Sequence, residues 1–489
     1  MRLSELLQKV EYVVLQGDEH IEVNELVYDS RKVSHNDVFL CICGAARDAH
    51  DYIDDVIVKG ATAIVVEKDV ELSGREGITI VKVKDSRYAL ACMSVEYFDN
   101  PAKDLITIGI TGTKGKTTTT YMVKSILDNI GIKTGLIGTI ETIIGDERIP
   151  SINTTPESYV VQKYFRKMVD AGCKCVVMEV SSQAMKLHRV AGFTFDYGIF
   201  TNLSKDHIGP NEHKDFEEYL NCKASLFRQC KHGIFNVDDK YATEIIKNAT
   251  CDIETFSIDA QSDYKANDIR MFTKPGCLGI AYDLTGKMNM PVEIDIPGRF
   301  SVYNSLTAIA ICSHFTKDIK VIESVLSDVR VKGRVEIIPV SPKYTLMIDY
   351  AHNAMSLESL LECIREYAPK RIVTLFGCGG NRDRNRRFEM GEVSSRLSDL
   401  TVVTSDNPRN EEPQAIIDDI LVGVNKYSGK YVTIPDRREA IKYVIEHGEE
   451  GDIIILAGKG HEDYQEIKGV KYPMDERVII EELKKELGL

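Results

Sequence analysis

Apolar positions and polar turns alternate in a regular order along the chain. Before residue 98, short apolar runs at residues 38–43, 61–66 and 78–83 predict strands, and residues 86–98 predict a helix. From residue 105, the sequence repeats an apolar run, a glycine-rich turn and an amphipathic helix. In the helix after Pro156, apolar side chains return to one face. This order is typical of a mostly parallel sheet covered by helices.

Two interruptions divide the pattern. The polar segment at residues 99–104 ends the first group of strands, and a second break falls at residues 331–334. After it, strands are expected near residues 345–348, 372–376, 400–404 and 453–456. We therefore predict three α/β domains, at residues 1–98, 99–331 and 332–489. The length of 489 residues agrees with this number, since a domain averages about 150 residues.

Composition excludes several classes of protein. With 43% hydrophobic and 28% charged residues, the chain is globular. A net charge of −14 disfavours binding to nucleic-acid phosphates. No apolar run reaches the roughly 18 residues of a membrane span, and the charged N-terminus does not match an export signal. The 12 cysteines lack disulfide or zinc spacing, so we interpret them as reduced thiols of a cytoplasmic protein.

The strongest chemical motif is TGTKGKTTT at residues 111–119, directly after an apolar run. A glycine turn that opens a helix directs backbone N–H groups at phosphates, while Lys116 can reach the terminal phosphates and Thr117 can bind magnesium. The spacing departs from the GxxxxGK[ST] pattern, because Ile110 replaces its first glycine. An ordinary strand-to-helix turn is the alternative. The motif predicts ATP or GTP binding and leaves the reaction open.

Two further expected strands end in polar groups that suit the same site. The strand that begins at residue 173 ends in Glu179, a usual position for a carboxylate that helps to hold nucleotide magnesium. The strand at residues 195–201 is followed by the segment that ends at His207. A solvated strand end is the alternative for Glu179, and a structural role is the alternative for His207.

Lys223 interrupts an apolar stripe of helical spacing, which is formed by Phe216, Leu220, Phe227 and Cys230. Spacing alone favours a side chain that extends to solvent from the edge of the stripe. The alternative is a buried, functional lysine.

Loops that contain glycine and arginine follow three expected strands of the last domain. These loops are FGCGGNRD at residues 376–383, DNPR at 406–409 and AGKGHE at 457–462. Because ligands bind at the carboxyl ends of parallel strands, Arg382 and Arg409 suggest recognition of an anion, most simply a carboxylate. Solvated loop charges and simple turn glycines are the alternatives.

Taken together and in order, these motifs resemble those of the Mur ligases of bacterial cell-wall synthesis over essentially the whole chain. The shared motifs are YDSR at residues 28–31, TGTKGKTTT, NTTP at 153–156, MEVSS at 178–182, HRV at 188–190, TNLSKDH at 201–207, Lys223, Asn304, DYAH at 349–352, DNPR and AGKGHE.

The resemblance implies a small N-terminal α/β domain that binds UDP, a central P-loop domain with a mostly parallel sheet, and a C-terminal Rossmann-like domain. It implies an ATP- and Mg²⁺-dependent ligase of cytoplasmic peptidoglycan precursor synthesis, expected to be monomeric. The implied substrates are UDP-N-acetylmuramoyl-L-alanyl-D-glutamate and meso-2,6-diaminopimelate. The D-glutamyl carboxylate would attack the γ-phosphate of ATP, and an amine would displace phosphate from the acyl phosphate.

The resemblance also implies the residues of each binding site. The UDP-linked substrate would be held by Ser30, Ala45, Ala46, Arg47, Asn153, Thr154, Thr155, Ser181 and Arg189. ATP would be held by Gly112, Thr113, Lys114, Gly115, Lys116, Thr117, Thr118, Asn304 and Arg334. Diaminopimelate would be held by Arg382, Asp406, Asn407, Pro408, Arg409, Gly458 and Glu462. Magnesium would be held by Thr117, Glu179, His207 and Lys223 as a carbamate, and the catalytic group would be Lys116, Glu179, His207 and Lys223.

Several alternatives share part of this pattern. L-lysine could replace diaminopimelate, although a second carboxylate better suits the arginine loops. Another Mur ligase or a folylpolyglutamate synthetase-like ligase would share the central motifs. A P-loop kinase or ATPase would share Lys116, Thr117 and Glu179, and a binding module could hold nucleotide without turnover.

Overall fold

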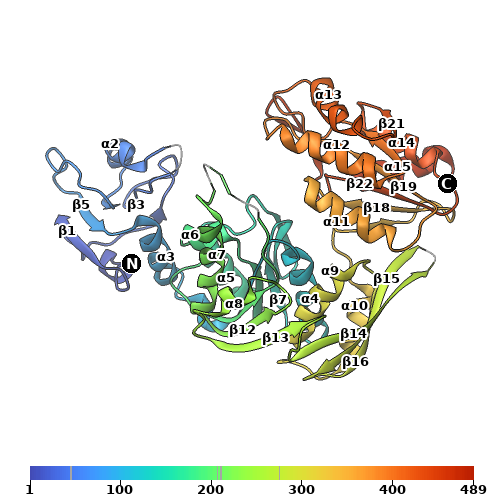
Figure 1. The fold of residues 1–489 in the computed structure, drawn as a ribbon. Coiled ribbons are helices and arrows are strands. Elements are labelled where there is room, and N and C mark those ends of the chain that lie inside the picture. Colours follow the sequence, from blue (N-terminus) through green and yellow to red (C-terminus); the bar gives the residue numbers. More distant parts are fainter. Residues whose placement is uncertain (45–46, 206–207, 210–211, 275) are drawn as a thin grey trace. The chain divides into compact units, whose positions relative to one another are not determined.

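The computed structural model describes residues 1–489 except 45–46, 206–207, 210–211 and 275 (Figure 1). The chain forms two compact units: Met1–Lys265 with Leu306–Lys317, and Ala266–Ser305 with Asp318–Leu489. Both contain helices and mostly parallel sheets, which confirms the predicted fold class. The domain boundaries at residues 98 and 331 stay a prediction. In the described part of the chain, no helix is long and apolar enough to cross a membrane.

The first unit begins with a five-stranded sheet in the order β1-β5-β4-β3-β2. Only β1 is antiparallel to its neighbour. Asp85 caps the helix that follows the sheet by accepting hydrogen bonds from two backbone N–H groups. The predicted runs correspond to β3, β4, β5 and α3, whereas the other elements were not predicted. The elements are α1 (Leu3–Leu6), β1 (Tyr12–Gln16), β2 (Leu26–Val27), β3 (Val38–Leu40), η1 (Ala49–Tyr52), α2 (Ile53–Val58), β4 (Ala63–Val66), β5 (Thr79–Val83) and α3 (Ser86–Tyr97).

A larger sheet follows, which includes the neighbouring strands β14-β13-β12-β11-β6-β10-β7-β8-β9 in this order. The strands from β13 to β7 in this order are parallel, and β8 and β9 form an antiparallel edge. Its elements are η2 (Pro101–Asp104), β6 (Ile106–Thr111), α4 (Lys116–Asn129), β7 (Thr134–Ile137), β8 (Glu141–Ile144), β9 (Glu147–Pro150), α5 (Ser158–Asp170), β10 (Cys175–Glu179), α6 (Ser182–Lys186), β11 (Phe195–Phe200), α7 (Phe216–Ala224), η3 (Ser225–Arg228), β12 (Cys230–Asn236), α8 (Ala242–Ile246), β13 (Asp252–Ser257) and β14 (Tyr264–Lys274).

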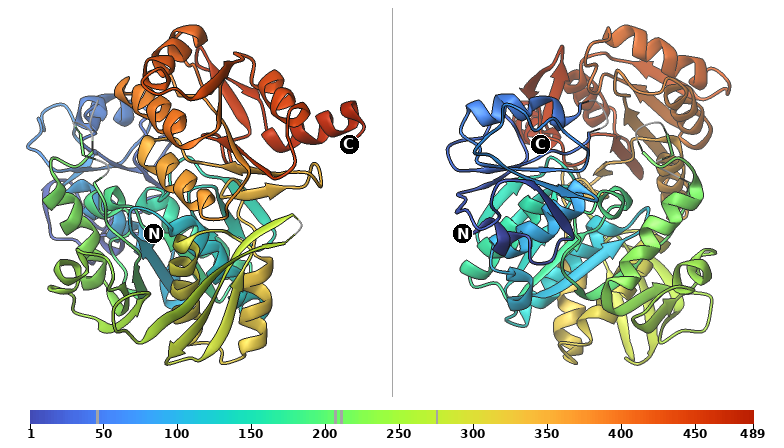
Figure 2. Two further views of the ribbon diagram at one scale, coloured as in Figure 1. Left: turned by 45° about the vertical axis from the view of Figure 1, so that its right-hand side comes forward. Right: turned by 90° about the vertical axis from the view of Figure 1, so that its left-hand side faces the viewer.

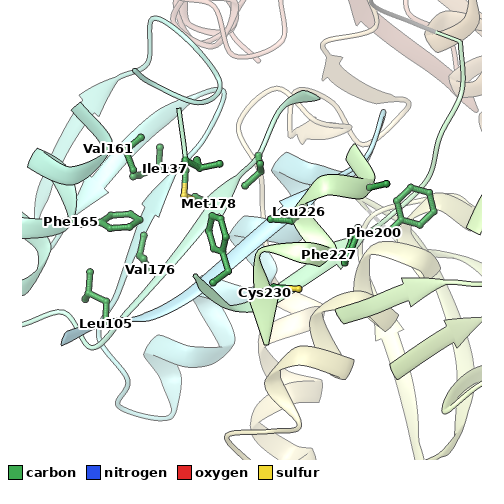
Figure 3. Close-up of a cluster of buried hydrophobic side chains, with 14 of the residues drawn as sticks. Leu105, Ile137, Val161, Phe165, Val176, Met178, Phe200, Leu226, Phe227 and Cys230 are labelled. Atoms are coloured by element: carbon green, nitrogen blue, oxygen red, sulfur yellow. The ribbon is translucent and has the colours of Figure 1, made fainter. Parts of the chain in front are cut away.

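One buried apolar cluster joins this sheet to its helices (Figure 3). Val161 and Phe165 of α5 belong to it, as do Val176 and Met178 of β10. The helix presents residues four apart and the strand presents residues two apart, which are the periods of the two structures. The amphipathic helix predicted after Pro156 is therefore confirmed.

The structure corrects one predicted helix. The stripe that contains Lys223 is α-helical only to Ala224, where α7 ends. Phe227 lies in the short 3₁₀ helix η3, and Cys230 already belongs to β12. Cys230 pairs with Phe195 of β11. Pairing with a strand distant in the sequence therefore overrides the local helical spacing of these apolar residues.

The second unit contains a six-stranded sheet in the order β17-β18-β22-β19-β20-β21, with helices on both faces (Figure 2). Only β17 is antiparallel, and the four strands predicted here are confirmed. The remaining elements are β15 (Cys277–Gly286), β16 (Met290–Ile294), α9 (Arg299–Cys312), α10 (Ile319–Asp328), β17 (Glu336–Ile338), β18 (Thr345–Asp349), α11 (Ala354–Arg365), β19 (Arg371–Phe376), α12 (Asn385–Leu397), β20 (Leu400–Val403), α13 (Pro413–Val424), β21 (Lys430–Thr433), α14 (Arg437–Glu446), β22 (Asp452–Ala457), β23 (Tyr464–Ile467), β24 (Val470–Pro473) and α15 (Glu476–Leu487).

Helices α12 and α13 approach each other at two glycines. A Cβ atom on Gly391 would lie 2.2 Å from the Ile420 carbonyl oxygen, and one on Gly423 would lie 1.9 Å from the Phe388 carbonyl oxygen. Both distances are far below van der Waals contact. The close packing of these helices therefore requires glycine at both positions.

We predict that Gly423→Ala separates the two helices and lowers the free energy of unfolding by about 1–3 kcal/mol, the usual cost of overpacking. Thermal unfolding followed by calorimetry measures this effect as a lower melting temperature. Val422→Ala is the matched control, because Val422 is the neighbouring residue and is 56% exposed. Equal melting temperatures for the two variants would contradict the close approach.

Candidate active site

Parallel register brings the first group of candidate residues to one edge of the large sheet. Ile110 of β6 pairs with Glu179 of β10, and Thr111 pairs with Phe200 of β11. The TGTKGKTTT loop, Glu179 and the TNLSKDH segment therefore leave adjacent strands at the same end. This is the edge at which α/β sheets bind ligands.

The loop after β6 requires glycine at its closest approach to β11. Gly112 has a φ of +152°, and a Cβ atom there would lie 1.9 Å from Thr201 Oγ1. Gly115, with a φ of +85°, precedes the first turn of α4. A helix N-terminus leaves its first backbone N–H groups without intrahelical acceptors and favours anions. The local structure is that of a phosphate-binding loop.

Asn202 and Tyr219 support this loop. The Asn202 carbonyl oxygen accepts a hydrogen bond from Thr113 N–H at 2.9 Å, and its Oδ1 accepts from Lys114 N–H at 2.9 Å. Tyr219 OH lies 2.9 Å from Thr113 Oγ1. Neither residue has a role that the sequence motifs predict. For Asn202 the available signal was its position directly after a parallel strand.

Two lysines share one carbonyl oxygen of the loop. Lys116 Nζ donates to the Gly112 carbonyl oxygen at 2.7 Å, and Lys223 Nζ donates to the same oxygen at 2.9 Å. Lys223 is 2% exposed, and its Nζ lies 4.8 Å from the centre of the Tyr219 ring. The structure therefore places Lys223 inside the protein beside the phosphate loop, rather than extended to solvent.

Glu179 is fixed at the end of β10 and is 1% exposed. Its Oε1 accepts a hydrogen bond from Thr139 N–H at 2.8 Å, and its Oε2 accepts from Thr139 Oγ1 at 3.0 Å. Thr117, in the first turn of α4, is 6% exposed. Carboxylate and hydroxyl oxygens are the hard donors that Mg²⁺ prefers, so this donor set fits the ion. His207 lies outside the described residues.

Thr155 connects Glu179 to the next candidate residues. Its Oγ1 donates to the Glu179 carbonyl oxygen at 2.7 Å and accepts from Ser181 N–H at 3.1 Å. Arg189 Nη1 donates to the Thr155 carbonyl oxygen at 3.0 Å, and Arg189 Nη2 lies 2.7 Å from Glu157 Oε1. Four residues from three motifs are thus held in one hydrogen-bonded group.

The other residues assigned to the UDP-linked substrate are less closely connected. Thr154 Oγ1 lies 3.1 Å from Thr139 Oγ1, whereas Asn153 is exposed. Ser30 accepts from Lys59 Nζ through its carbonyl oxygen at 2.7 Å, and Arg47 is exposed. Between described residues, no hydrogen bond joins Ser30 or Arg47 to the Thr155 group. Ala45 and Ala46 lie outside the described residues.

Cys43, Asp48 and His50 form a small polar cluster next to residues 45–46, with ligand atoms within 4.8 Å of one another. His50 Nε2 accepts a hydrogen bond from Glu67 N–H at 3.2 Å, so the ring proton lies on Nδ1, which is 2.6 Å from Asp48 Oδ1. A metal ion on Nδ1 would require the proton on Nε2. This cluster therefore suits hydrogen bonds that brace its loop, and not a metal site.

Register also brings together the candidate loops of the second unit. Ala457 of β22 pairs with Asp349 of β18 and with Phe376 of β19, and Phe376 pairs with Val403 of β20. The DYAH, FGCGGNRD, DNPR and AGKGHE motifs consequently leave four adjacent parallel strands at one edge. The structure confirms that these loops follow strands, as the sequence predicts.

Lys459 fixes two of the predicted amino-acid ligands and is completely buried. Its Nζ donates to Asn407 Oδ1 at 3.0 Å and to Glu462 Oε2 at 2.8 Å. Asn407 Nδ2 donates to the same Glu462 oxygen at 2.8 Å. Asn407 and Glu462 are predicted ligands, whereas the role of the lysine that contacts both is not predicted from the sequence.

Arg437 of α14 joins the ends of two strands. Its Nη1 donates to the Ser405 carbonyl oxygen at 3.2 Å, and its Nη2 donates to the Ala457 carbonyl oxygen at 3.1 Å. Its Nε donates to Glu476 Oε1 at 2.9 Å in a buried ion pair. The sequence offers no signal for this role, because Arg437 belongs to a charged helix start.

The predicted anion-binding arginines differ in their surroundings. Arg409 Nη1 donates to the Gly380 carbonyl oxygen at 2.8 Å, whereas Arg382 is exposed and makes no hydrogen bond within the described part of the chain. Asp406 is 8% exposed, and its Oδ1 accepts from Asn407 N–H at 2.6 Å. Pro408 is buried beside it, and Gly458 has a φ of +106°.

The two residues assigned to adenine and phosphates also lie in the second unit. Asn304 of α9 is 6% exposed. The Arg334 guanidinium lies 4.9 Å from the centre of the Tyr350 ring, and the His461 ring lies 4.7 Å from that ring. Burial, aided by the nearby Arg334 charge, lowers the pKa of His461 to about 4.

Comparisons with known proteins agree with this order of motifs. Three family models match: Mur ligase family, catalytic domain (residues 22–97), Mur ligase middle domain (110–312), and Mur ligase, glutamate ligase domain (333–460). The chain is 42% identical to the UDP-N-acetylmuramoyl-L-alanyl-D-glutamate–2,6-diaminopimelate ligase of Clostridium perfringens, with coverage of 98% of this chain and 99% of the relative. It is 43% identical to the enzyme of the same name from Clostridium tetani over 100% of both chains.

A solved structure of a UDP-N-acetylmuramoyl-L-alanyl-D-glutamate–2,6-diaminopimelate ligase has the same fold. It superimposes with a TM-score of 0.73 at 26% identity and covers 100% of this chain and 99% of its own. The similarity therefore extends over both units and all the motifs described above.

The lowered pKa of His461 predicts a pH dependence of stability. An unfolded histidine has a pKa of about 6.5, so the unfolded chain takes up the proton first as the pH falls. The contribution of the neutral ring to the free energy of unfolding is fully present above pH 6.5. It is lost as the pH falls towards 4, by up to about 3 kcal/mol. We expect His461→Gln to lose less stability than wild type between pH 7.5 and 4.5 in urea unfolding. Parallel pH profiles would contradict the assignment.

Proposed function

The chain belongs to the Mur ligase family, and we propose that it joins meso-2,6-diaminopimelate to UDP-N-acetylmuramoyl-L-alanyl-D-glutamate with cleavage of ATP to ADP and phosphate. The observation that carries this proposal is the phosphate loop, where Lys116 and Lys223 meet at the Gly112 carbonyl oxygen. The names of the relatives support the choice of substrates. The protein acts as a cytoplasmic monomer in peptidoglycan precursor synthesis.

The phosphate loop binds ATP. Residues 112–118 surround the phosphates, and Lys116 exchanges its loop carbonyl partners for phosphate oxygens. Asn304 contacts adenine and Arg334 contacts the phosphates. Thr117, Glu179, His207 and carbamylated Lys223 would hold Mg²⁺, which neutralises charge on the phosphoryl oxygens when bound.

The UDP-linked substrate extends from the N-terminal sheet to the phosphate loop. Ser30 and residues 45–47 hold the UDP end. Asn153, Thr154, Thr155, Ser181 and Arg189 hold the muramoyl dipeptide. The hydrogen bonds from Thr155 to Glu179 and from Arg189 to Thr155 support this assignment. They connect these residues to the edge of the sheet at which the phosphate loop lies.

The loops of the second unit hold the amino acid. Arg382, Asp406, Asn407, Pro408, Arg409, Gly458 and Glu462 form this site. Diaminopimelate carries a distal carboxylate that L-lysine lacks, and a guanidinium binds such a group through charge-assisted hydrogen bonds. Arg409 is the main discriminator between the two amino acids, and Arg382 assists it.

The reaction has two steps. An oxygen of the D-glutamyl carboxylate attacks the γ-phosphorus, the bond to the bridging oxygen breaks, and ADP leaves. The amine of diaminopimelate then attacks the acyl carbon of the acyl phosphate and loses a proton, and phosphate leaves as the amide forms. The loop N–H groups and Lys116 stabilise charge on the transferred phosphoryl group.

A substrate panel with product mass tests this function. ADP release should require both the UDP-muramoyl dipeptide and an amino acid, and the product should carry the mass of added diaminopimelate. Turnover with lysine alone would identify a lysine ligase. ADP release without an amino acid would favour a kinase or ATPase, and nucleotide binding without release would favour a binding module.

We predict that Lys116→Ala lowers the rate of ADP release by roughly a hundredfold or more, because it removes a charge that acts on the transferred phosphoryl group. The melting temperature should change little, since within the described residues Lys116 Nζ donates to the Gly112 and Thr113 carbonyl oxygens of its own loop. Lys163→Ala, an exposed change on α5, is the control. Unchanged turnover in the Lys116 variant would disprove the phosphate-loop assignment.

We also predict that Lys223 is carbamylated. Carbon dioxide adds to a neutral amine with release of a proton, and Lys223 is buried, a setting that disfavours the charged form of an amine. Carbon-13 NMR of protein equilibrated with labelled bicarbonate should show a carbamate signal that is absent from Lys223→Ala.

The matched control for this experiment is Lys174→Ala, which removes an exposed lysine and should retain the signal. A spectrum that is the same for wild type and Lys223→Ala, with equal activity, would leave Lys223 as an ordinary lysine.

A further inference from the structure

The hairpin of β23 and β24 lies beyond residue 460, where the match to the glutamate ligase domain ends. Its first strand is nevertheless bonded to the DNPR loop. Gln465 Nε2 donates to the Asp406 carbonyl oxygen at 2.7 Å, and Glu466 N–H donates to Asn407 Oδ1 at 2.8 Å. Lys459 Nζ donates to the Tyr464 carbonyl oxygen. The hairpin is thus attached to two of the loops that hold the amino acid.

The strongest attachment is at Arg409, whose backbone is held in an unfavourable conformation. Its φ is +51°, a left-handed value that is unfavourable for a non-glycine residue. Arg409 N–H donates to the Glu466 carbonyl oxygen at 2.9 Å, and Lys468 N–H donates to the Arg409 carbonyl oxygen at 2.7 Å. The hairpin therefore keeps Arg409 in this conformation.

The side chains of Arg409 and Glu466 are joined as well as their backbones. Arg409 Nε donates to Glu466 Oε2 at 3.1 Å, while Nη1 donates to the Gly380 carbonyl oxygen at 2.8 Å. Nη2 has no hydrogen-bond partner within the described ranges. Both side chains of the ion pair are about a quarter exposed, at 23% for Arg409 and 26% for Glu466. Two nitrogens thus fix the plane of the guanidinium, and the third stays available to a ligand.

We propose that Glu466 is a positioning residue for amino-acid selection, which holds the Arg409 guanidinium in the orientation that binds the distal carboxylate of diaminopimelate. This inference rests on the proposed function. A guanidinium fixed before binding loses less side-chain freedom when the carboxylate arrives. If Glu466 no longer holds the guanidinium, binding of diaminopimelate alone should weaken, because L-lysine has no distal carboxylate.

A purely structural role for Glu466 gives a different expectation. If the carboxylate only attached the hairpin to its loop, its removal would displace Asn407 and the neighbouring ligands, and both amino acids would lose activity together. Selectivity between the two substrates therefore separates positioning of Arg409 from general support of the site.

The experiment compares kcat/KM for diaminopimelate and L-lysine in wild type, Glu466→Ala, Glu466→Gln and Arg409→Ala, together with the double variant Glu466→Ala/Arg409→Ala. Glu466→Ala should lower the diaminopimelate-to-lysine ratio roughly tenfold, through KM for diaminopimelate, with little change in kcat. Glu466→Gln should restore most of the ratio, because its amide oxygen still accepts from Nε–H. The double variant should be no less selective than Arg409→Ala alone.

Glu358→Ala is the matched control, since it removes an exposed carboxylate from a surface ion pair with Arg396 in the same unit. It should leave the ratio unchanged. The inference would be overturned by an unaltered ratio in Glu466→Ala or by equal losses of kcat/KM for both amino acids. It would also be overturned if Glu466→Ala lowered the ratio as much in the Arg409→Ala background as in wild type. A wild type that does not ligate diaminopimelate would instead overturn the proposed function, so the two failures are distinguishable.

Discussion

In both units, parallel strand pairing sets the carboxyl ends of neighbouring strands at one edge of a sheet, and the candidate chemistry depends on this constraint. The pairs Ile110 with Glu179 and Thr111 with Phe200 align the phosphate loop, the acidic strand end and the TNLSKDH segment. A change of register by one residue would turn Glu179 to the opposite face of its sheet. The sheets therefore provide the rigid framework, and the loops present the candidate site residues.

Within that framework, the loops are held by buried polar contacts. Gly112 lies so close to Thr201 that no other residue fits, and its carbonyl oxygen accepts from both site lysines. In the second unit, buried Lys459 and Arg437 connect the loops after β20 and β22. Removing one partner of a buried charged pair leaves the other uncompensated, so these contacts fix the loops strongly.

Much of this molecule could be predicted from local sequence. Apolar periodicity predicted the α/β fold class, and the glycine and arginine motifs predicted loops that do follow adjacent parallel strands. The end of α7 could not be predicted, because Cys230 pairs with Phe195 of β11 instead of continuing the helix. The support given by Arg437, Lys459 and Glu466 was also missed. Their partners lie on other strands and loops, and local spacing carries no information about such pairing.

The central claim is that the phosphate loop transfers a phosphoryl group to a carboxylate, so that amide formation proceeds through an acyl phosphate. Its most direct test uses UDP-muramoyl dipeptide with both D-glutamyl carboxylates labelled with oxygen-18, together with ATP, magnesium and diaminopimelate. The account predicts that each released phosphate contains one labelled oxygen, because the bond between the carboxylate oxygen and phosphorus survives when the amine displaces phosphate. Amide product accompanied by unlabelled phosphate would contradict it.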